Sequence, residues 1–169
     1  MSNNKVINEI IFSAIKNSNL EIINICLKNN IDIDIYNDRD ESILLHAVQQ
    51  ENIDMIKLII KHVKINDNDN YFSISPLHIA CDIGNKEIVR LLLDNNADIE
   101  IVDNNYMTPL HYATKNNNLK IIKLLIKYKA KINVIDSYKR LPIHLTTDKN
   151  ITKILLEKGS YINSSEYKY

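Results

Sequence analysis

The stretch Ser75-Pro76-Leu77-His78-Ile79-Ala80 returns twice along the chain, each time after 33 residues. Its further copies read Thr108-Pro109-Leu110-His111-Tyr112-Ala113 and Leu141-Pro142-Ile143-His144-Leu145. An apolar run follows each copy, at residues 88–93, 121–126 and 154–156. Self-similarity at a fixed period of this length predicts an array of stacked structural units.

Each well-formed copy carries the signals of a helix that begins at the motif. Ser75 or Thr108 can accept a hydrogen bond from an early backbone N–H of that helix. The proline that follows fits the first turn, where its missing N–H has no partner to lose. Gly84 predicts a left-handed residue at the end of the helix, and Asn117, which stands in the same place one unit later, is the usual second choice. The apolar run then predicts a second helix in each unit.

This pattern resembles the ankyrin repeat, whose signature is T-P-L-H-x-A on a 33-residue period. The resemblance covers nearly the whole chain. It implies an all-α solenoid of about five helix-turn-helix repeats joined by short β-hairpin-like loops. We expect one domain over residues 1–169, with repeats at about 4–36, 37–69, 70–102, 103–135 and 136–163 and a polar tail at 164–169.

Three of these units match the motif less well. The second has Ser42 as its cap, and its second helix is expected over residues 54–62. The fifth has Leu141 in place of the cap, lacks about three residues after His144, and should have its second helix over 151–158. The first has no T-P-L-H motif, so it is either an atypical end repeat, which stacks on one side only, or an unrelated capping helix pair.

The loop tips between units depart from the family's D-x-x-G-x-T pattern. The glycine position is occupied by Asp40, Ser73, Tyr106 and Lys139. If the turn keeps its left-handed residue, Tyr106 and Lys139 each cost on the order of 1 kcal/mol relative to glycine.

Composition limits the function classes. Lys plus Arg and Asp plus Glu both number 21, so the net charge is zero and no basic surplus indicates a nucleic-acid or anionic-membrane partner. The N-terminus lacks a signal-peptide pattern, and no apolar run approaches the roughly 20 residues that span a bilayer. Cys26 and Cys81 form no C-x-x-C pair, which favours a reducing intracellular location, in the cytoplasm or nucleus.

The sequence shows no catalytic or cofactor motif. Neither phosphate-binding glycine pattern is present, nor is a G-x-S-x-G or H-E-x-x-H motif. His78, His111 and His144 occupy one position per repeat, about 10 Å apart along the stack, whereas zinc ligands lie about 2 Å from one ion. The resemblance implies instead that this histidine is structural, bonding within its own turn and to the neighbouring loop. Cys26 and Cys81 should lie roughly 20 Å apart, too far for a disulfide, and are expected to fill the core. We therefore expect no enzyme activity, metal or cofactor.

The resemblance implies that protein partners bind the concave face, through loop tips and the exposed turns of the first helices. Carried over position by position, the expected partner-binding residues are Arg39, Glu41, Gln49, Gln50, Phe72, Ile74, Asp82, Ile83, Asn105, Met107, Lys115, Asn116, Tyr138 and Arg140.

The third repeat places apolar side chains at several of these positions. Tyr71, Phe72, Ile74 and Ile83, with the adjoining Tyr106 and Met107, would form a contiguous patch of the kind that marks interaction sites. The alternative is that Phe72 and Ile74 fold inward onto the altered link before them.

The resemblance implies a non-enzymatic, monomeric protein-interaction module. The abundant Ile, Asn, Lys and Tyr all have A/T-rich codons, and the degenerate repeats look like the ankyrin proteins of large DNA viruses, above all poxviruses. Such proteins include mimics of the NF-kappaB inhibitor and adaptors to host ubiquitin ligases. No F-box-like segment follows Ser160, so a direct binder of a host signalling or immune protein is favoured over an adaptor. The alternatives are a scaffold or effector of an A/T-rich protist or intracellular bacterium, and a regulatory subunit of an enzyme.

Overall fold

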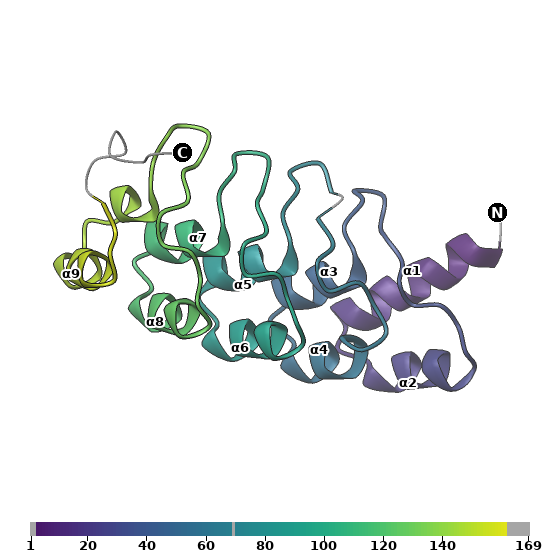
Figure 1. Cartoon of the computed structure of the whole chain (residues 1–169). Coiled ribbons are helices and arrows are strands. Elements are labelled where there is room, and N and C mark those ends of the chain that lie inside the picture. The colour runs from purple at the N-terminus through teal and green to yellow at the C-terminus, as the bar shows by residue number, and fades with distance from the viewer. Residues whose placement is uncertain (1–2, 69, 162–169) are drawn as a thin grey trace.

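The computed structural model of the chain describes residues 3–68 and 70–161, and within them the helices stack in two rows along an elongated array (Figure 1). The inner row consists of α1 (Asn3–Lys16), α3 (Ile43–Gln49), α5 (Pro76–Ile83), α7 (Pro109–Lys115) and the 3-10 helix η1 (Pro142–Leu145). The outer row consists of α2 (Leu20–Lys28), α4 (Ile53–Ile59), α6 (Lys86–Asp94), α8 (Leu119–Lys127) and α9 (Lys149–Glu157). The predicted all-α repeat solenoid is confirmed.

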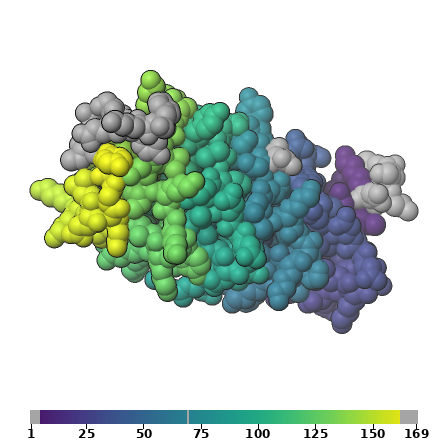
Figure 2. Space-filling view, in the orientation of Figure 1, coloured from purple at the N-terminus to yellow at the C-terminus, as the bar shows by residue number. Residues whose placement is uncertain are grey.

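Long loops project from one edge of the inner row and end in the tips between consecutive helix pairs (Figure 1). Among the described residues the only β pairing is an isolated bridge between Tyr36 and Ser42. In the space-filling view the units follow one another as successive slabs (Figure 2). The predicted polar tail, residues 164–169, lies outside the described residues.

The core lies between the two rows and repeats with the sequence. One buried column, at 33-residue spacing, consists of Ile11, Leu44, Leu77, Leu110 and Ile143. A second consists of Ala14, Ala47, Ala80 and Ala113, whose small side chains let the paired helices approach closely. Cys26 belongs to a third column with Ile59, Leu92 and Leu125. Each unit thus buries its apolar positions against its own partner helix and against the adjacent units.

Asparagine begins most of the outer helices. Asn19, Asn52, Asn85 and Asn118, again 33 residues apart, are the N-caps of α2, α4, α6 and α8, and each side chain accepts a hydrogen bond from a first-turn N–H. The side-chain amide of Asn52 also donates to Ser18 Oγ at 2.8 Å, and that of Asn85 to Glu51 Oε2 at 2.9 Å. These asparagines therefore both start a helix and tie it to the preceding unit.

Two helices differ from their predicted extents. α4 ends at Ile59. Beyond it the chain forms a turn, in which the His62 N–H donates to the Ile59 carbonyl at 2.8 Å. α9 begins at Lys149, two residues earlier than predicted, since Asp148 accepts from the N–H groups of Asn150 and Ile151. In the fifth unit η1 replaces an α-helix, because Leu141 offers no capping hydroxyl and few residues separate the motif from α9.

Candidate protein-binding surface

The tips have a shared internal scaffold built on one polar side chain. Asn37, Asn70, Asp103 and Asp136 stand 33 residues apart, and in each the side-chain oxygen accepts from the backbone N–H groups two and four residues later, at 2.8–3.3 Å. Such bonds hold a turn in one conformation without help from a β ladder. These four residues were not predicted, although their 33-residue spacing is visible in the sequence.

The tips keep their left-handed residue without glycine. Asp40, Ser73, Tyr106 and Lys139 have φ values of 56°, 53°, 58° and 59°. Gly84 and Asn117, at the ends of α5 and α7, also have positive φ, as predicted. The tip geometry of the family is therefore retained, and Tyr106 and Lys139 adopt a conformation that favours glycine.

His78 and His111 each connect one tip to the next. His78 Nδ1 accepts from the Ser75 N–H at 3.1 Å, so Nε2 carries the proton and donates to the Met107 carbonyl at 2.9 Å. His111 repeats the arrangement with the Thr108 N–H at 3.0 Å and the Arg140 carbonyl at 3.3 Å. Burial lowers the pKa of both rings, which keeps them neutral. The predicted structural role of these two residues is confirmed.

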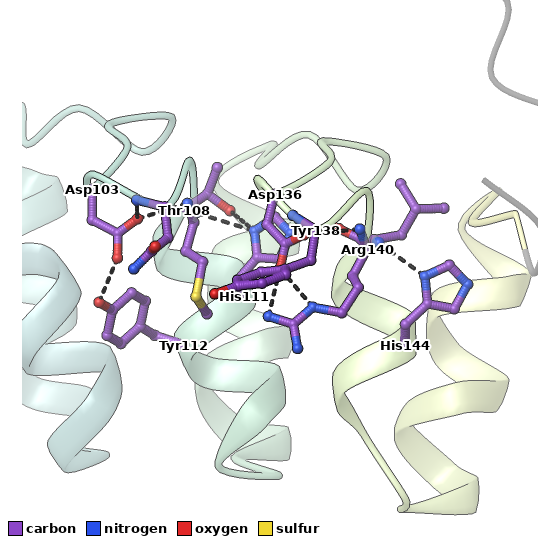
Figure 3. A network of polar contacts seen from close by, with 11 residues as sticks. Asp103, Thr108, His111, Tyr112, Asp136, Tyr138, Arg140 and His144 are labelled. Carbon is purple, nitrogen blue, oxygen red and sulfur yellow. Dashed lines mark hydrogen bonds and ion pairs between the residues drawn. The ribbon is translucent and has the colours of Figure 1, made fainter. Parts of the chain in front are cut away.

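Three further contacts stiffen the last tips (Figure 3). The Tyr112 hydroxyl donates to Asp103 Oδ2 at 2.8 Å. Arg140 Nη2 lies 2.7 Å from Asp136 Oδ2, and its guanidinium lies over the Tyr138 ring, 4.8 Å from the centroid. Burial opposes the charge of Asp136, but the bonds from Arg140 and from the Tyr138 N–H outweigh it and lower the pKa of this carboxyl.

Most of the expected partner-binding residues are exposed. The exposed ones are Arg39, Gln49, Gln50, Phe72, Asp82, Ile83, Asn105, Lys115, Asn116 and Tyr138, while Glu41, Ile74 and Arg140 are half-buried. Met107 requires a correction, since its side chain is only 8% exposed. Its N–H donates to Asp103 and its carbonyl accepts from His78, and this fixed backbone holds the side chain inward.

Aromatic side chains gather on three consecutive tips. The exposed fractions are 82% for Tyr71, 61% for Phe72, 63% for Tyr106 and 70% for Tyr138. We call these four residues the tip aromatics. Phe72 therefore does not fold inward, and only Ile74 of that pair is partly covered. Tyr106 occupies the family's glycine position, which is why it was not among the residues carried over.

Adjacent tips are joined directly. The Asn104 N–H donates to the Phe72 carbonyl at 3.2 Å, and its side-chain amide donates to the Tyr71 carbonyl at 2.8 Å. One repeat later the Ser137 N–H donates to the Asn105 carbonyl at 2.8 Å. The tip aromatics are thus presented on loops held in a fixed relation to one another.

The two cysteines belong to the core. Cys26 and Cys81 are free and buried, as predicted for core residues, and burial raises the pKa of the Cys81 thiol. Within residues 3–68 and 70–161 there is no group of three or more His, Cys, Asp or Glu that could hold a metal ion. Nor does any described helix combine the length and apolar character required to cross a bilayer.

Comparison with known proteins identifies the fold family. No curated protein gives a significant match to the chain. The family model for ankyrin repeats in three copies matches residues 11–103 and again residues 77–166, which together cover most of the sequence. Arrays of this kind are typically non-catalytic modules for binding other proteins. The chain therefore belongs to the ankyrin-repeat family.

Proposed function

We propose that this module binds its protein partner across the tips of the third, fourth and fifth repeats, with the tip aromatics as anchors. The observation that carries the proposal is their exposure on three joined tips. Tyrosine and phenylalanine bury a large area on binding and lose few rotamers. Aromatic side chains are also over-represented among the residues that dominate binding energy.

Other expected partner-binding residues supply a polar rim for the tip aromatics. Asp82 and Asn116, at the ends of α5 and α7, are joined by two bonds of 2.8 Å from the Asn116 amide. Lys115, which precedes Asn116, and Asn105, which precedes Tyr106, are also exposed. An apolar centre with a polar border is the usual arrangement of a specific protein interface.

The partner we propose is a signalling or immune protein of a host cell. The A/T-rich codon bias and the resemblance to poxvirus ankyrin proteins support this choice, and the two free buried cysteines are compatible with a reducing compartment. A role as a scaffold or effector in an A/T-rich protist or intracellular bacterium would use the same surface.

The experiment compares partner capture by two variants with matched chemistry. Phe72→Ser with Tyr106→Ser removes two tip aromatics, whereas Ile25→Ser removes an exposed apolar side chain from α2 in the outer row. Proteins captured from host-cell extract are identified by mass spectrometry, and the thermal unfolding of each variant is recorded. We expect a partner that the wild type and Ile25→Ser retain and the tip variant loses. Equal capture by the tip variant, or loss of capture together with a large drop in unfolding temperature, would contradict the proposal.

A further inference from the structure

The zero net charge of the chain conceals a strong division along its length. Residues 1–103 contain nine Lys or Arg and 17 Asp or Glu, which gives a net charge of −8. Residues 104–169 contain twelve Lys or Arg and four Asp or Glu, which gives a net charge of +8. Between Asp103 and Asp136 there are six lysines and no acidic residue. The last two units therefore present a surface of opposite sign to the rest of the array.

Helix geometry places many of these lysines on one side of the outer row. In α8 the residues that pack inward are Ile121, Ile122, Leu124 and Leu125. Lys120, Lys123 and Lys127 are exposed and follow the i, i+3, i+7 spacing of a single helical face. In the described part of the chain none of these three lysines forms an ion pair.

A groove runs between this face and α9, which stands next to α8 at the end of the array (Figure 1). It has a volume of about 450 Å³, and its lining consists of Lys123, Ile126, Lys127, Ile154, Glu157 and Lys158. Ile126 and Ile154 are half-buried and supply an apolar floor. Glu157 lies 3.9 Å from Lys153, so its charge is already balanced within α9. The rim keeps three lysines without an acidic partner among the described residues.

The corresponding groove between α4 and α6 is of similar size but has more acidic residues in its lining, two against three basic ones. Its volume is about 530 Å³, and it is lined by Lys57, Lys86, Glu87, Arg90, Leu91 and Asp94. Lys57 and Glu87 form an ion pair at 3.6 Å. Grooves between outer helices thus occur at two places in the array, and the α8–α9 groove has the larger positive excess, three lysines against one carboxylate that is paired with Lys153.

We propose that the α8–α9 groove is a second docking site, which binds an acidic protein segment with apolar side chains directed to the Ile126–Ile154 floor. A recessed apolar floor with a cationic rim fits a peptide of this chemistry, which is a recurrent mode of recognition. Single-stranded nucleic acids are bound through aromatic stacking, and the lining contains no aromatic or arginine side chain. A membrane-binding surface presents its apolar side chains outward, whereas Ile126 and Ile154 are recessed. This site lies on the outer helices, so the inference does not depend on the tip aromatics.

The test measures binding of a short fluorescein-labelled peptide of glutamates with two leucines one helical turn apart, by anisotropy, to the whole chain at low and at physiological salt. The variant Lys123→Gln, Lys127→Gln, Lys158→Gln removes three charges from the groove. The control Lys57→Gln, Lys86→Gln, Arg90→Gln removes three charges from the α4–α6 groove. Both sets replace exposed side chains, and thermal unfolding verifies that the variants are folded.

We expect the groove variant to bind the peptide roughly tenfold more weakly, since it loses up to three ion pairs with the glutamates of the peptide. The control should change affinity less than twofold, and Ile154→Ser should weaken binding without altering its salt dependence. The proposal is overturned if the wild type does not bind the peptide at low salt, or if the control loses as much affinity as the groove variant. It is also overturned if a single-stranded DNA oligonucleotide or phosphatidylcholine–phosphatidylserine vesicles compete better than the unlabelled peptide, or if the chain binds a second copy of itself more tightly.

Discussion

The fourth and fifth repeats begin with nearly the same motif and fold differently. In the fourth, Thr108 precedes a regular helix, α7, and His111 is fully buried. In the fifth, Leu141 precedes the short η1 and His144 is exposed. The Nε2 atom of His111 reaches the Arg140 carbonyl on the next tip, whereas no further tip follows His144 in the described array. The comparison shows that the motif histidine is buried where the tip of the next repeat packs beside it, as at His111, and exposed at His144 in the last described repeat.

Core truncation should show the largest difference between the two repeats. Leu110 and Ile143 are equivalent positions, but Leu110 is 1% exposed with a unit packed on each side, while Ile143 is 7% exposed near the end. Leu110→Ala should cost about 2–5 kcal/mol, because it leaves a cavity that cannot collapse. Ile143→Ala should cost less, roughly 1–2 kcal/mol, since the end of the array can relax. Urea unfolding followed by circular dichroism measures both values, and an equal or larger cost at Ile143 would contradict the comparison.

Removal of the histidines should give the next largest contrast. His111→Ala leaves the buried Thr108 N–H and the Arg140 carbonyl without their partner, at a cost of about 1–3 kcal/mol. His144→Ala should cost less, about 1 kcal/mol, because the ring that accepts from the Leu141 N–H at 2.9 Å is exposed and water can take its place. The same denaturation measurement applies. Similar losses in the two variants would show that the inter-repeat bond contributes little.

Lowering the pH should destabilise the fold through the protonation of the two buried histidines, His78 and His111. Their folded-state pKa values lie below the unfolded value of about 6.5, so the unfolded chain takes up protons first. The free energy of unfolding should therefore be independent of these histidines above about pH 6.5. As the pH drops from there towards the folded-state pKa, it should fall by at most about 1.4 kcal/mol per pH unit for each histidine. Asp136, whose carboxyl pKa is lowered, makes a stabilising contribution that is complete above about pH 4 and is lost only at more acidic pH, so it adds no slope in this window.

Urea midpoints recorded between neutral pH and pH 5 test this expectation. His78→Ala combined with His111→Ala should flatten the dependence. Leu110→Ala, which lowers stability but keeps both rings, should preserve it. If the urea midpoint of the double variant kept the same pH dependence, groups other than these two histidines would cause it.

The 33-residue period and its motif residues were enough to predict the helix pairs and the caps Ser42 and Gly84, whereas the structural role of His78 and His111 was implied by the resemblance to ankyrin repeats. The burial of Met107 could not be predicted in the same way, because it depends on the bond that its N–H donates to Asp103 within the tip and on the bond that its carbonyl accepts from His78 of the preceding unit. The asparagines offer a different lesson. Their abundance was read as codon bias, yet Asn52 and its equivalents begin outer helices, and their spacing was a signal available in the sequence. The charge division was equally visible, but a summed net charge hides it.

The smallest expected effect concerns the tips, where the two repeats should behave alike. Tyr106 and Lys139 have φ values of 58° and 59°, so glycine at either position should relieve backbone strain and stabilise the fold by up to about 1 kcal/mol. Asp40→Gly should gain less, because aspartate tolerates this conformation better than tyrosine or lysine. Gly84→Ala provides the opposite control, since φ is 92° and an added Cβ would lie 2.7 Å from Asn118 Nδ2. Equal gains from Tyr106→Gly and Lys139→Gly in urea unfolding would place the difference between the fourth and fifth repeats in the histidine bond and the cap. If only Tyr106→Gly stabilised the fold, the backbone at Lys139 would carry no strain. The weaker packing of the fifth repeat would then extend to its loop tip.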